Sequence, residues 1–204
     1  MEGGVNWSFD VRMKTLQVQF GDLHPTRAAC VAALRAWFPC ADHMWIDEQN
    51  CLWWVRGMNA YLGINREWPI DTIQDRMILS DRLKFYVCAT VPDLLYIDTD
   101  VLLLKKIELD PNCLYYGESI PGPMPDICIM YNGQMESFGR ILRESITPGW
   151  IGQTCSQLVV NEKYRLVPYD AFVHFGVPAL PRKIEHDEKH WWHPPDIQPS
   201  TIGV

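Results

Sequence analysis

Apolar and polar positions follow a helical period in some stretches of this chain and a strand period in others. In the N-terminal half the two patterns alternate, and glycine, proline or aspartate separates them. In chain order the predicted elements are a strand at 15–20, a helix at 27–38, a strand at 43–46, helices at 50–62 and 72–89, and a strand at 94–97. Thr26 and Asp71 are the expected N-caps of the first and third helices. Strands and helices in this order are typical of an α/β fold, in which helices flank a sheet.

The strand at 94–97 has the sequence LLYI, which is short and apolar enough for a central strand buried on both faces. It runs directly into Asp98-Thr99-Asp100. Ligands of open α/β sheets bind beyond the carboxyl ends of the strands, so the acidic pair falls where a site is expected. The alternative is a solvated turn, but two acids at the end of a buried strand are costly without a counter-ion.

The C-terminal half contains shorter elements. In chain order they are a strand at 113–116, a proline-rich turn at 120–125, a strand at 127–131, a helix at 134–145, and short elements at 158–161, 165–167 and 171–175. Residues 186–204 have no periodicity and are predicted to be an irregular tail. The chain has no internal repeat or low-complexity segment, and its 204 residues suit a single domain over 1–204.

The composition limits the classes of function. Hydrophobic residues make up 48% of the chain and charged residues 21%, which predicts a sizeable core. A net charge of −7 gives no general attraction for phosphate backbones, so nucleic acid is not expected as a partner. With no evident signal peptide and no apolar run long enough to span a bilayer, the protein is expected in the cytoplasm. The seven cysteines lack CxxC spacing and are expected to be buried free thiols.

Two carboxylates separated by one residue can hold one hard divalent cation, which leaves positions open for phosphate oxygens. Such a cation neutralises the charge on a departing diphosphate and stabilises the transition state. Asp98 and Asp100 are therefore candidate metal ligands. The tail carries a second set of possible ligands, but the sequence HWWHPPD disfavours the helix that would bring them together, so no metal is expected there. This second set is His186, His190 and His193.

The segment LLYIDTDVLLLKKIEL (94–109) resembles the DxD segment of glycosyltransferase family 8, to which glycogenin and bacterial galactosyltransferases belong. The resemblance implies a GT-A type fold, with a Rossmann-like mixed sheet flanked by helices and the DxD pair at the end of a central strand. It implies that Asp98, Thr99 and Asp100 contact a UDP-sugar donor and that the two aspartates bind Mn²⁺ or Mg²⁺. It also implies a nucleotide-binding half at about 15–110 and an acceptor and metal half at about 111–185.

Upstream, Arg82-Leu83 resembles the basic–leucine pair that precedes the DxD strand in this family, which implies that Arg82 faces the donor sugar and phosphate. Ser80-Asp81 with Lys84 resembles the SDxxR motif of family 32, which implies that Asp81 also lies at the donor site. Phe20 and Gly21, at the end of the first strand, are candidates for lining the nucleotide base.

Downstream, SQLVVN (156–161) resembles the DQDxLN motif, in which Gln157 would lie near the reacting carbon. Ser156 departs from the motif, since an acid usually stands there. PDICIMYN (125–132) resembles a donor-contacting strand of the family, with Asp126 in place of an asparagine. Both departures affect the part of the site that contacts the donor sugar, so the identity of that sugar is left open.

The segment FVHFGVPALPRK (172–183) resembles HFxGxxKPW, which implies that His174 is the third metal ligand and that Gly176, one place earlier than in the motif, lies at the donor site. Leu180 stands where the motif has a lysine. Arg182 or Lys183 would then supply the positive charge from a shifted loop.

Together these resemblances predict a metal-dependent glycosyltransferase that retains anomeric configuration and moves a hexose from a UDP-sugar to a glycan, protein or small molecule. Catalysis is assigned to Gln157, Asp126 and Arg82. Two alternatives are open. Ser156 and Leu180 are also compatible with a non-catalytic module that binds a nucleotide-sugar or metal. A phosphatase of the haloacid dehalogenase type would use Asp98 as its nucleophile, but its DxD pair usually lies near the N-terminus.

Overall fold

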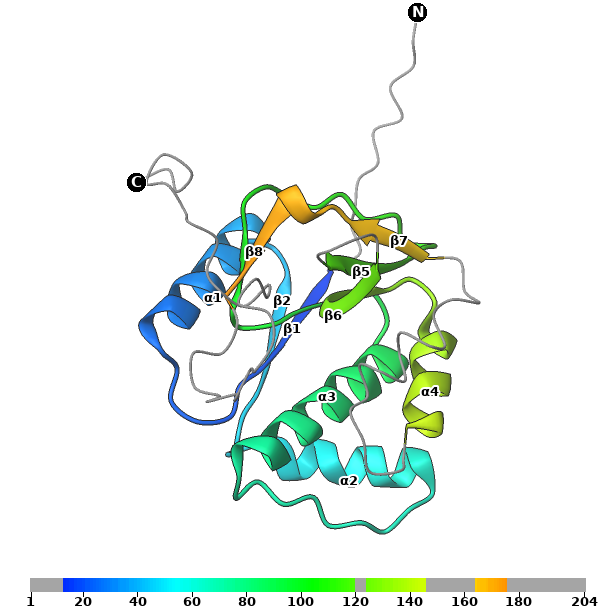
Figure 1. Ribbon diagram of the computed structural model, residues 1–204. Coiled ribbons are helices and arrows are strands. Elements are labelled where there is room, and N and C mark those ends of the chain that lie inside the picture. The colour runs from blue at the N-terminus through cyan, green and yellow to red at the C-terminus, as the bar shows by residue number, and fades with distance from the viewer. Residues whose placement is uncertain (1–12, 120–123, 146–163, 176–204) are drawn as a thin grey trace, which may run out of the picture.

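The computed structural model of the protein describes residues 13–119, 124–145 and 164–175. Within these residues six strands form one sheet in the order β2-β1-β3-β6-β5-β7, and β4 pairs with β8 in a separate two-stranded sheet (Figure 1). The strands are β1 (Lys14–Val18), β2 (Asp42–Ile46), β3 (Leu94–Ile97), β4 (Val101–Leu103), β5 (Leu114–Ser119), β6 (Met124–Asn132), β7 (Tyr164–Val167) and β8 (Phe172–His174). The helices are α1 (Pro25–Trp37), α2 (Cys51–Leu62), α3 (Ile73–Thr90) and α4 (Met135–Glu144).

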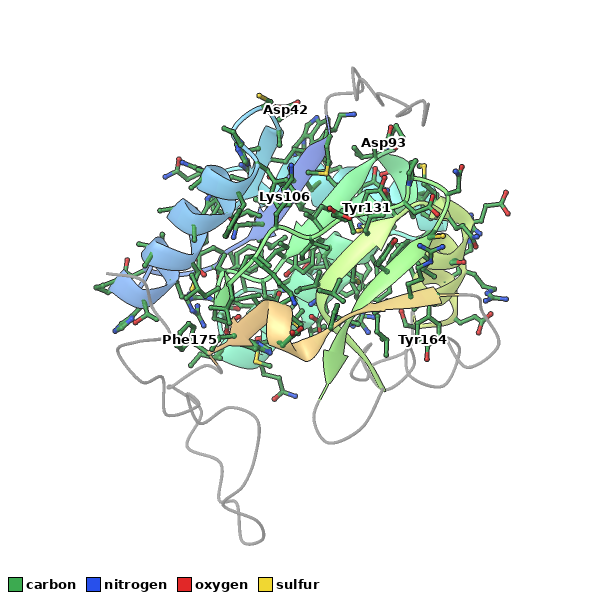
Figure 2. All side chains as sticks on the ribbon, turned by 90° about the horizontal axis from the view of Figure 1, so that it is seen from above. Asp42, Asp93, Lys106, Tyr131, Tyr164 and Phe175 are labelled. Atoms are coloured by element: carbon green, nitrogen blue, oxygen red, sulfur yellow. The ribbon has the colours of Figure 1, made fainter. Side chains whose placement is uncertain are left out.

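The large sheet is mixed. Strands β2, β1 and β3 are parallel, whereas β6 runs antiparallel to β3 and to β5. The carboxyl ends of the three parallel strands therefore meet at one edge. Figure 2 shows Asp42 and Asp93, where β2 and β3 start, on one side of the molecule and Phe175 on the other. The predicted fold class is confirmed, because helices flank a mixed sheet and the acidic pair follows a central strand.

Two hydrophobic clusters cover the two faces of the sheet, as a period-2 strand requires. Leu94 and Tyr96 belong to the cluster beneath α2, α3 and α4, and Leu95 and Ile97 belong to the cluster that contains residues of α1, β4 and β8. Figure 1 shows α2, α3 and α4 together on one side of the sheet and α1 with β8 on the other. All four side chains of β3 are buried, which confirms the prediction of a strand covered on both faces.

The N-caps of α1 and α3 lie one or two residues from the positions predicted from the sequence. The N-cap of α1 is His24 rather than Thr26, and its ring Nδ1 accepts the Thr26 N–H at 3.3 Å. The next residue is a proline, whose fixed φ suits the first helical position. The N-cap of α3 is Thr72 rather than Asp71. Thr72 forms a reciprocal capping box with Asp75, so both side chains satisfy backbone N–H groups.

The C-terminal half matches the predicted order where it is described. Strand β6 starts at Met124, inside the segment predicted to be a turn, and pairs with β5 along most of its length. Residues 114–116, 127–131 and 165–167 all join the large sheet that β1 to β3 began, whereas 172–174 pair with β4. The predicted element at 158–161 and the tail lie outside the described residues.

Two sequence-level expectations concern cysteines and membranes. Each of the six described cysteines is a free thiol, and four of them are buried, while Cys40 is exposed and Cys113 is partly exposed. None of the helices within the described ranges is long and apolar enough to cross a membrane.

Candidate metal and donor site

The acidic pair lies in a tight turn between the two sheets. The Asp98 N–H donates to the Cys128 carbonyl at 2.8 Å, which ties the turn to β6. The Val101 N–H then donates to the Asp98 carbonyl at 3.1 Å and closes the turn. Because β3 ends and β4 begins within three residues, both carboxylates are held at the carboxyl edge of the large sheet.

His174 reaches the acidic pair through the small sheet. Strand β8 pairs antiparallel with β4 and sets His174 opposite Val101, next to Asp100. The following N–H, of Phe175, donates to the Asp100 carbonyl at 2.7 Å. His174 Nε2 lies 3.4 Å from Asp100 Oδ1, and one ligand atom from each of Asp98, Asp100 and His174 falls within 4.8 Å of the others.

This donor set fits a divalent cation. Two carboxylate oxygens and one imidazole nitrogen are ligands that Mn²⁺ accepts, and three protein ligands leave positions open for water or phosphate. Burial raises the pKa of Asp98 to about 6; Lys84 opposes that rise and the Asp100 charge adds to it. The two carboxylates thus repel each other in a partly dry environment, and a divalent cation would relieve that repulsion.

A buried lysine stands on the α3 side of the pair. Lys84 Nζ lies 2.9 Å from Asp81 Oδ1 and 3.6 Å from Asp98 Oδ1, and its side chain is 3% exposed. Its ammonium also lies 5.0 Å from the centre of the Tyr96 ring, and the Tyr96 hydroxyl donates to Asp98. The predicted donor residue Asp81 is therefore connected to Asp98 through Lys84.

On the α1 side, a buried glutamine connects the acidic turn, helix α1 and the segment predicted to line the base. Gln19, at the end of β1, accepts from the Thr99 hydroxyl at 2.8 Å and from Arg27 Nη1 at 3.2 Å. Its amide nitrogen donates to the carbonyls of Phe20 and Gly21 at 3.0 and 3.4 Å. Thr99, a predicted donor contact, thus has its hydroxyl directed at Gln19 and holds the acidic turn against β1.

The segment predicted to line the base is at the same edge. Gly21 has φ of 82°, in the left-handed region that favours glycine, and its N–H donates to a Glu48 carboxylate oxygen after β2. A Cβ at this position would lie 3.3 Å from Arg76 Nη1 of α3. Phe20 is partly buried against the core beneath α2 and α3.

Arg82 lies away from this cluster. It is 2% exposed, and its guanidinium donates to the Ser145 carbonyl at 2.9 Å and the Ile78 carbonyl at 3.2 Å. It also lies 5.4 Å from the centre of the Trp68 ring. These contacts join α3 to the end of α4, so the structure gives Arg82 a packing role, and its predicted contact with the donor stays a prediction.

Several predicted residues cannot be placed at the site. Gln157, Gly176, Arg182 and Lys183 lie outside the described residues. The backbone of Asp126 belongs to β6 and pairs with Gly117 of β5.

Sequence reasoning did not identify Gln19 and Arg27, and it noted Lys84 only through the family 32 motif. The polar residues Thr15, Gln17 and Gln19 alternate with apolar ones along β1, and all three are buried. Buried polar side chains on a central strand are uncommon unless they have partners, so this alternation was the available signal for Gln19. Arg27 lies in a helix turn of ordinary composition, and no feature of the sequence around it pointed to a site.

No family model matches the chain, and no curated protein matches its sequence. Solved structures of glycosyltransferases are similar to it. A glycosyltransferase involved in glycosylation of the major capsid of PBCV-1 is 12% identical over 77% of this chain and 81% of that protein, with a TM-score of 0.46. The glycosyltransferase GlyE of Streptococcus pneumoniae is 11% identical over 76% of this chain and 45% of its own length, with a TM-score of 0.45.

The galactosyltransferase LgtC, solved in complex with donor and acceptor sugar analogs, is 14% identical over 72% of this chain and 64% of LgtC, with a TM-score of 0.35. The chain thus spans less than half of GlyE and less than two thirds of LgtC. At these identities and TM-scores the likeness carries no conclusion about activity.

Proposed function

We propose that this chain is a metal-dependent glycosyltransferase that moves a hexose from a UDP-sugar to an acceptor with retention of configuration. The observation that carries the proposal is the convergence of Asp98, Asp100 and His174, whose ligand atoms lie within 4.8 Å of one another. Two sequence motifs far apart in the chain had assigned these three residues to one metal. Their meeting at the carboxyl edge of the sheet supports that assignment.

A bound cation, Mn²⁺ or Mg²⁺, would supply Lewis-acid stabilisation of the diphosphate that leaves the sugar. Around it the protein provides a partly buried cluster of side chains with both signs of charge. Asp98 and Asp100 offer oxygen ligands, and Lys84 and Arg27 keep these acids from repelling each other fully. Gln19 and Thr99 hold the acidic turn at a fixed distance from the base-lining segment, so that base and diphosphate are positioned together.

Retention requires no strong general base, because the departing diphosphate can accept the proton of the acceptor hydroxyl. In this proposal Gln157 stabilises the positively charged sugar in the transition state, and Asp126 orients it. Arg82 would steady the donor if its contacts with α4 open. The acceptor is a glycan, a protein or a small molecule, and loops, whose sequences vary freely, build acceptor sites.

Thermal unfolding of the full chain tests the donor site. The wild type and an Asp98→Ala/Asp100→Ala variant are compared with UDP, GDP or phosphate, each with and without MnCl₂. A ligand at a hundred times its dissociation constant stabilises by about 2.7 kcal/mol, or roughly 5–10 °C for a chain of this size. We expect this shift for the wild type with UDP and Mn²⁺ together and its loss in the double variant. If no nucleotide shifts the wild type, the proposal is wrong.

The same protein separates the two alternatives. Release of UDP and free sugar from a UDP-hexose, dependent on Mn²⁺, indicates transferase chemistry with water as a poor acceptor, whereas binding without turnover indicates a non-catalytic module. Capture of phosphate on Asp98, detected by mass spectrometry after incubation with a phosphate ester, would instead indicate a phosphatase.

A further inference from the structure

Arg27 stands at the acidic cluster on an element that no motif had connected with it. It lies in the first turn of α1, and its side chain is 19% exposed. Its Nη2 is 3.8 Å from Asp100 Oδ2, within ion-pair distance but too long for a hydrogen bond. Among the described residues, its Nη1 donates a hydrogen bond to Gln19 Oε1 at 3.2 Å. A guanidinium has five N–H donors, so most of its capacity is not committed to Asp100 or Gln19.

The two cations of the cluster differ in what they can reach. Lys84 is 3% exposed and held between Asp81 and Asp98, so its charge serves these two acids. Arg27 is more accessible, and its Nη2 is paired with Asp100 at the longer distance of 3.8 Å. A planar guanidinium also matches the geometry of phosphate oxygens better than an ammonium does.

The surroundings of Arg27 favour an anion. It is the third residue of a 13-residue helix whose N-terminus carries partial positive charge. The base-lining residues Phe20 and Gly21 are joined to Arg27 through Gln19. A nucleoside diphosphate with its base at Gly21 and its phosphates at the acidic pair would therefore pass beside this guanidinium.

We infer that Arg27 is a phosphate-binding residue of this site, which neutralises Asp100 in the metal-free protein and turns to the diphosphate when a divalent cation is held by the acids. The inference rests on the proposed function, since it needs a nucleoside diphosphate as ligand. Arg27 would take over the role of the lysine that Leu180 replaces in the sequence motif. Arg27 competes with a cation for Asp100 but attracts the diphosphate. Its removal should therefore strengthen the binding of the cation and weaken the binding of the diphosphate.

The opposite changes in cation and diphosphate affinity distinguish a phosphate-binding residue from one that only supports the fold. In Arg27→Ala, Mn²⁺ alone binds about threefold or more tightly than in the wild type, because a positive charge beside Asp100 is gone. UDP in the presence of saturating Mn²⁺ binds roughly 10- to 100-fold more weakly, the usual effect of losing a charged hydrogen bond. A residue that only supports the fold would weaken both.

The measurement is isothermal titration calorimetry on the full chain with MnCl₂ alone, then with UDP or inorganic pyrophosphate at saturating MnCl₂. Pyrophosphate has no base, so it separates a phosphate contact from an indirect effect through Gln19 on the base-lining segment. Arg27→Lys, which keeps the charge without the planar fork, should recover part of the affinity. Arg35→Ala, which removes an exposed arginine from the same helix, is the charge-matched control and should leave all titrations unchanged.

Each outcome decides between distinct conclusions. Tighter Mn²⁺ binding with weaker UDP and pyrophosphate binding supports the inference. Equal weakening of Mn²⁺ and UDP, or a loss for UDP with normal pyrophosphate binding, overturns the role of Arg27 while the donor site stands. If the wild type binds neither UDP nor pyrophosphate with Mn²⁺, the proposed function fails and the role of Arg27 with it.

Discussion

The imidazole of His174 and the carboxylate of Asp100 face each other, with Nε2 3.4 Å from Oδ1, although His174 ends β8 and Asp100 lies in the turn before β4. Their contact depends on the pairing of β4 with β8 and on the hydrogen bond from the Phe175 N–H to the Asp100 carbonyl. The pairing of the small sheet thus places a histidine beside the acidic pair.

Substitution of His174 tests whether this contact serves a metal. His174→Ala should bind Mn²⁺ at least tenfold more weakly, because one of three protein ligands is lost. Its stability without metal should change by less than about 1 kcal/mol, since the ring is partly exposed at the end of a strand. Mn²⁺ titration followed by calorimetry measures the affinity, and thermal unfolding without metal measures the stability.

The control for His174→Ala is Asp170→Ala. Asp170 lies just before β8 and forms an exposed ion pair with Lys105 at 2.9 Å, outside the metal cluster. Its loss should leave Mn²⁺ affinity unchanged. Normal Mn²⁺ affinity in His174→Ala would remove the histidine from the ligand set.

Acid should weaken metal binding through Asp98. The pKa of this carboxyl is raised by burial to about 6, so protons compete with the cation below that pH. Without metal, the stability of the fold depends on pH in the opposite direction. A raised pKa favours the protonated folded form, so the contribution of Asp98 to stability declines as pH rises through about 6. The Mn²⁺-induced rise in melting temperature should therefore grow from pH 5 to pH 7. A shift of equal size at both pH values would contradict this.

How far the sequence predicted the site can be seen by comparing the acidic pair with its neighbours. Asp98, Asp100 and His174 were all assigned, because each lies in a motif whose local pattern fixes its place at a strand end. The order of strands and helices was also predicted, because apolar periodicity is a local property. The caps of α1 and α3 were misplaced, since several adjacent residues in each segment have side chains able to cap.

The partners of the acidic pair were harder to predict because they depend on how helices pack. On α3, Arg82 and Lys84 are both buried and both basic, and the sequence favoured Arg82 as the donor contact. The rotation of α3 on the sheet directs Lys84 towards Asp98 and Arg82 towards the end of α4, and the donor contact of Arg82 stays a prediction. Contacts of Gln19 with Thr99 join segments far apart in the chain, and no local pattern encodes them.

The position of Lys84 makes its removal informative. In Lys84→Met the pKa of Asp98 should rise further, because the Lys84 charge now lowers it. The pH below which Mn²⁺ binding weakens should rise accordingly. Loss of one member of a buried charge cluster should also cost about 3 kcal/mol of stability without metal, part of which Mn²⁺ restores.

The Lys84 experiment has two controls. Lys84→Arg keeps the charge and should keep the pH dependence of Mn²⁺ binding close to that of the wild type. Lys106→Met removes an exposed lysine and should change neither stability nor metal binding. An unchanged pH profile in Lys84→Met would show that the lysine does not tune Asp98.

Two glycines with positive φ separate backbone strain from an effect on ligand binding. Gly21 and Gly63 have φ of 82° and 67°, so alanine at either position should cost about 1 kcal/mol of stability. A Cβ at Gly63 meets no atom within 4 Å, whereas one at Gly21 lies 3.3 Å from Arg76 Nη1 and at the predicted base site. Only Gly21→Ala should therefore weaken UDP binding, by roughly tenfold if the methyl group costs a close contact of about 1.4 kcal/mol. Thermal unfolding and UDP titration at saturating Mn²⁺ measure both effects, and equal UDP affinity in the two variants would place the base elsewhere.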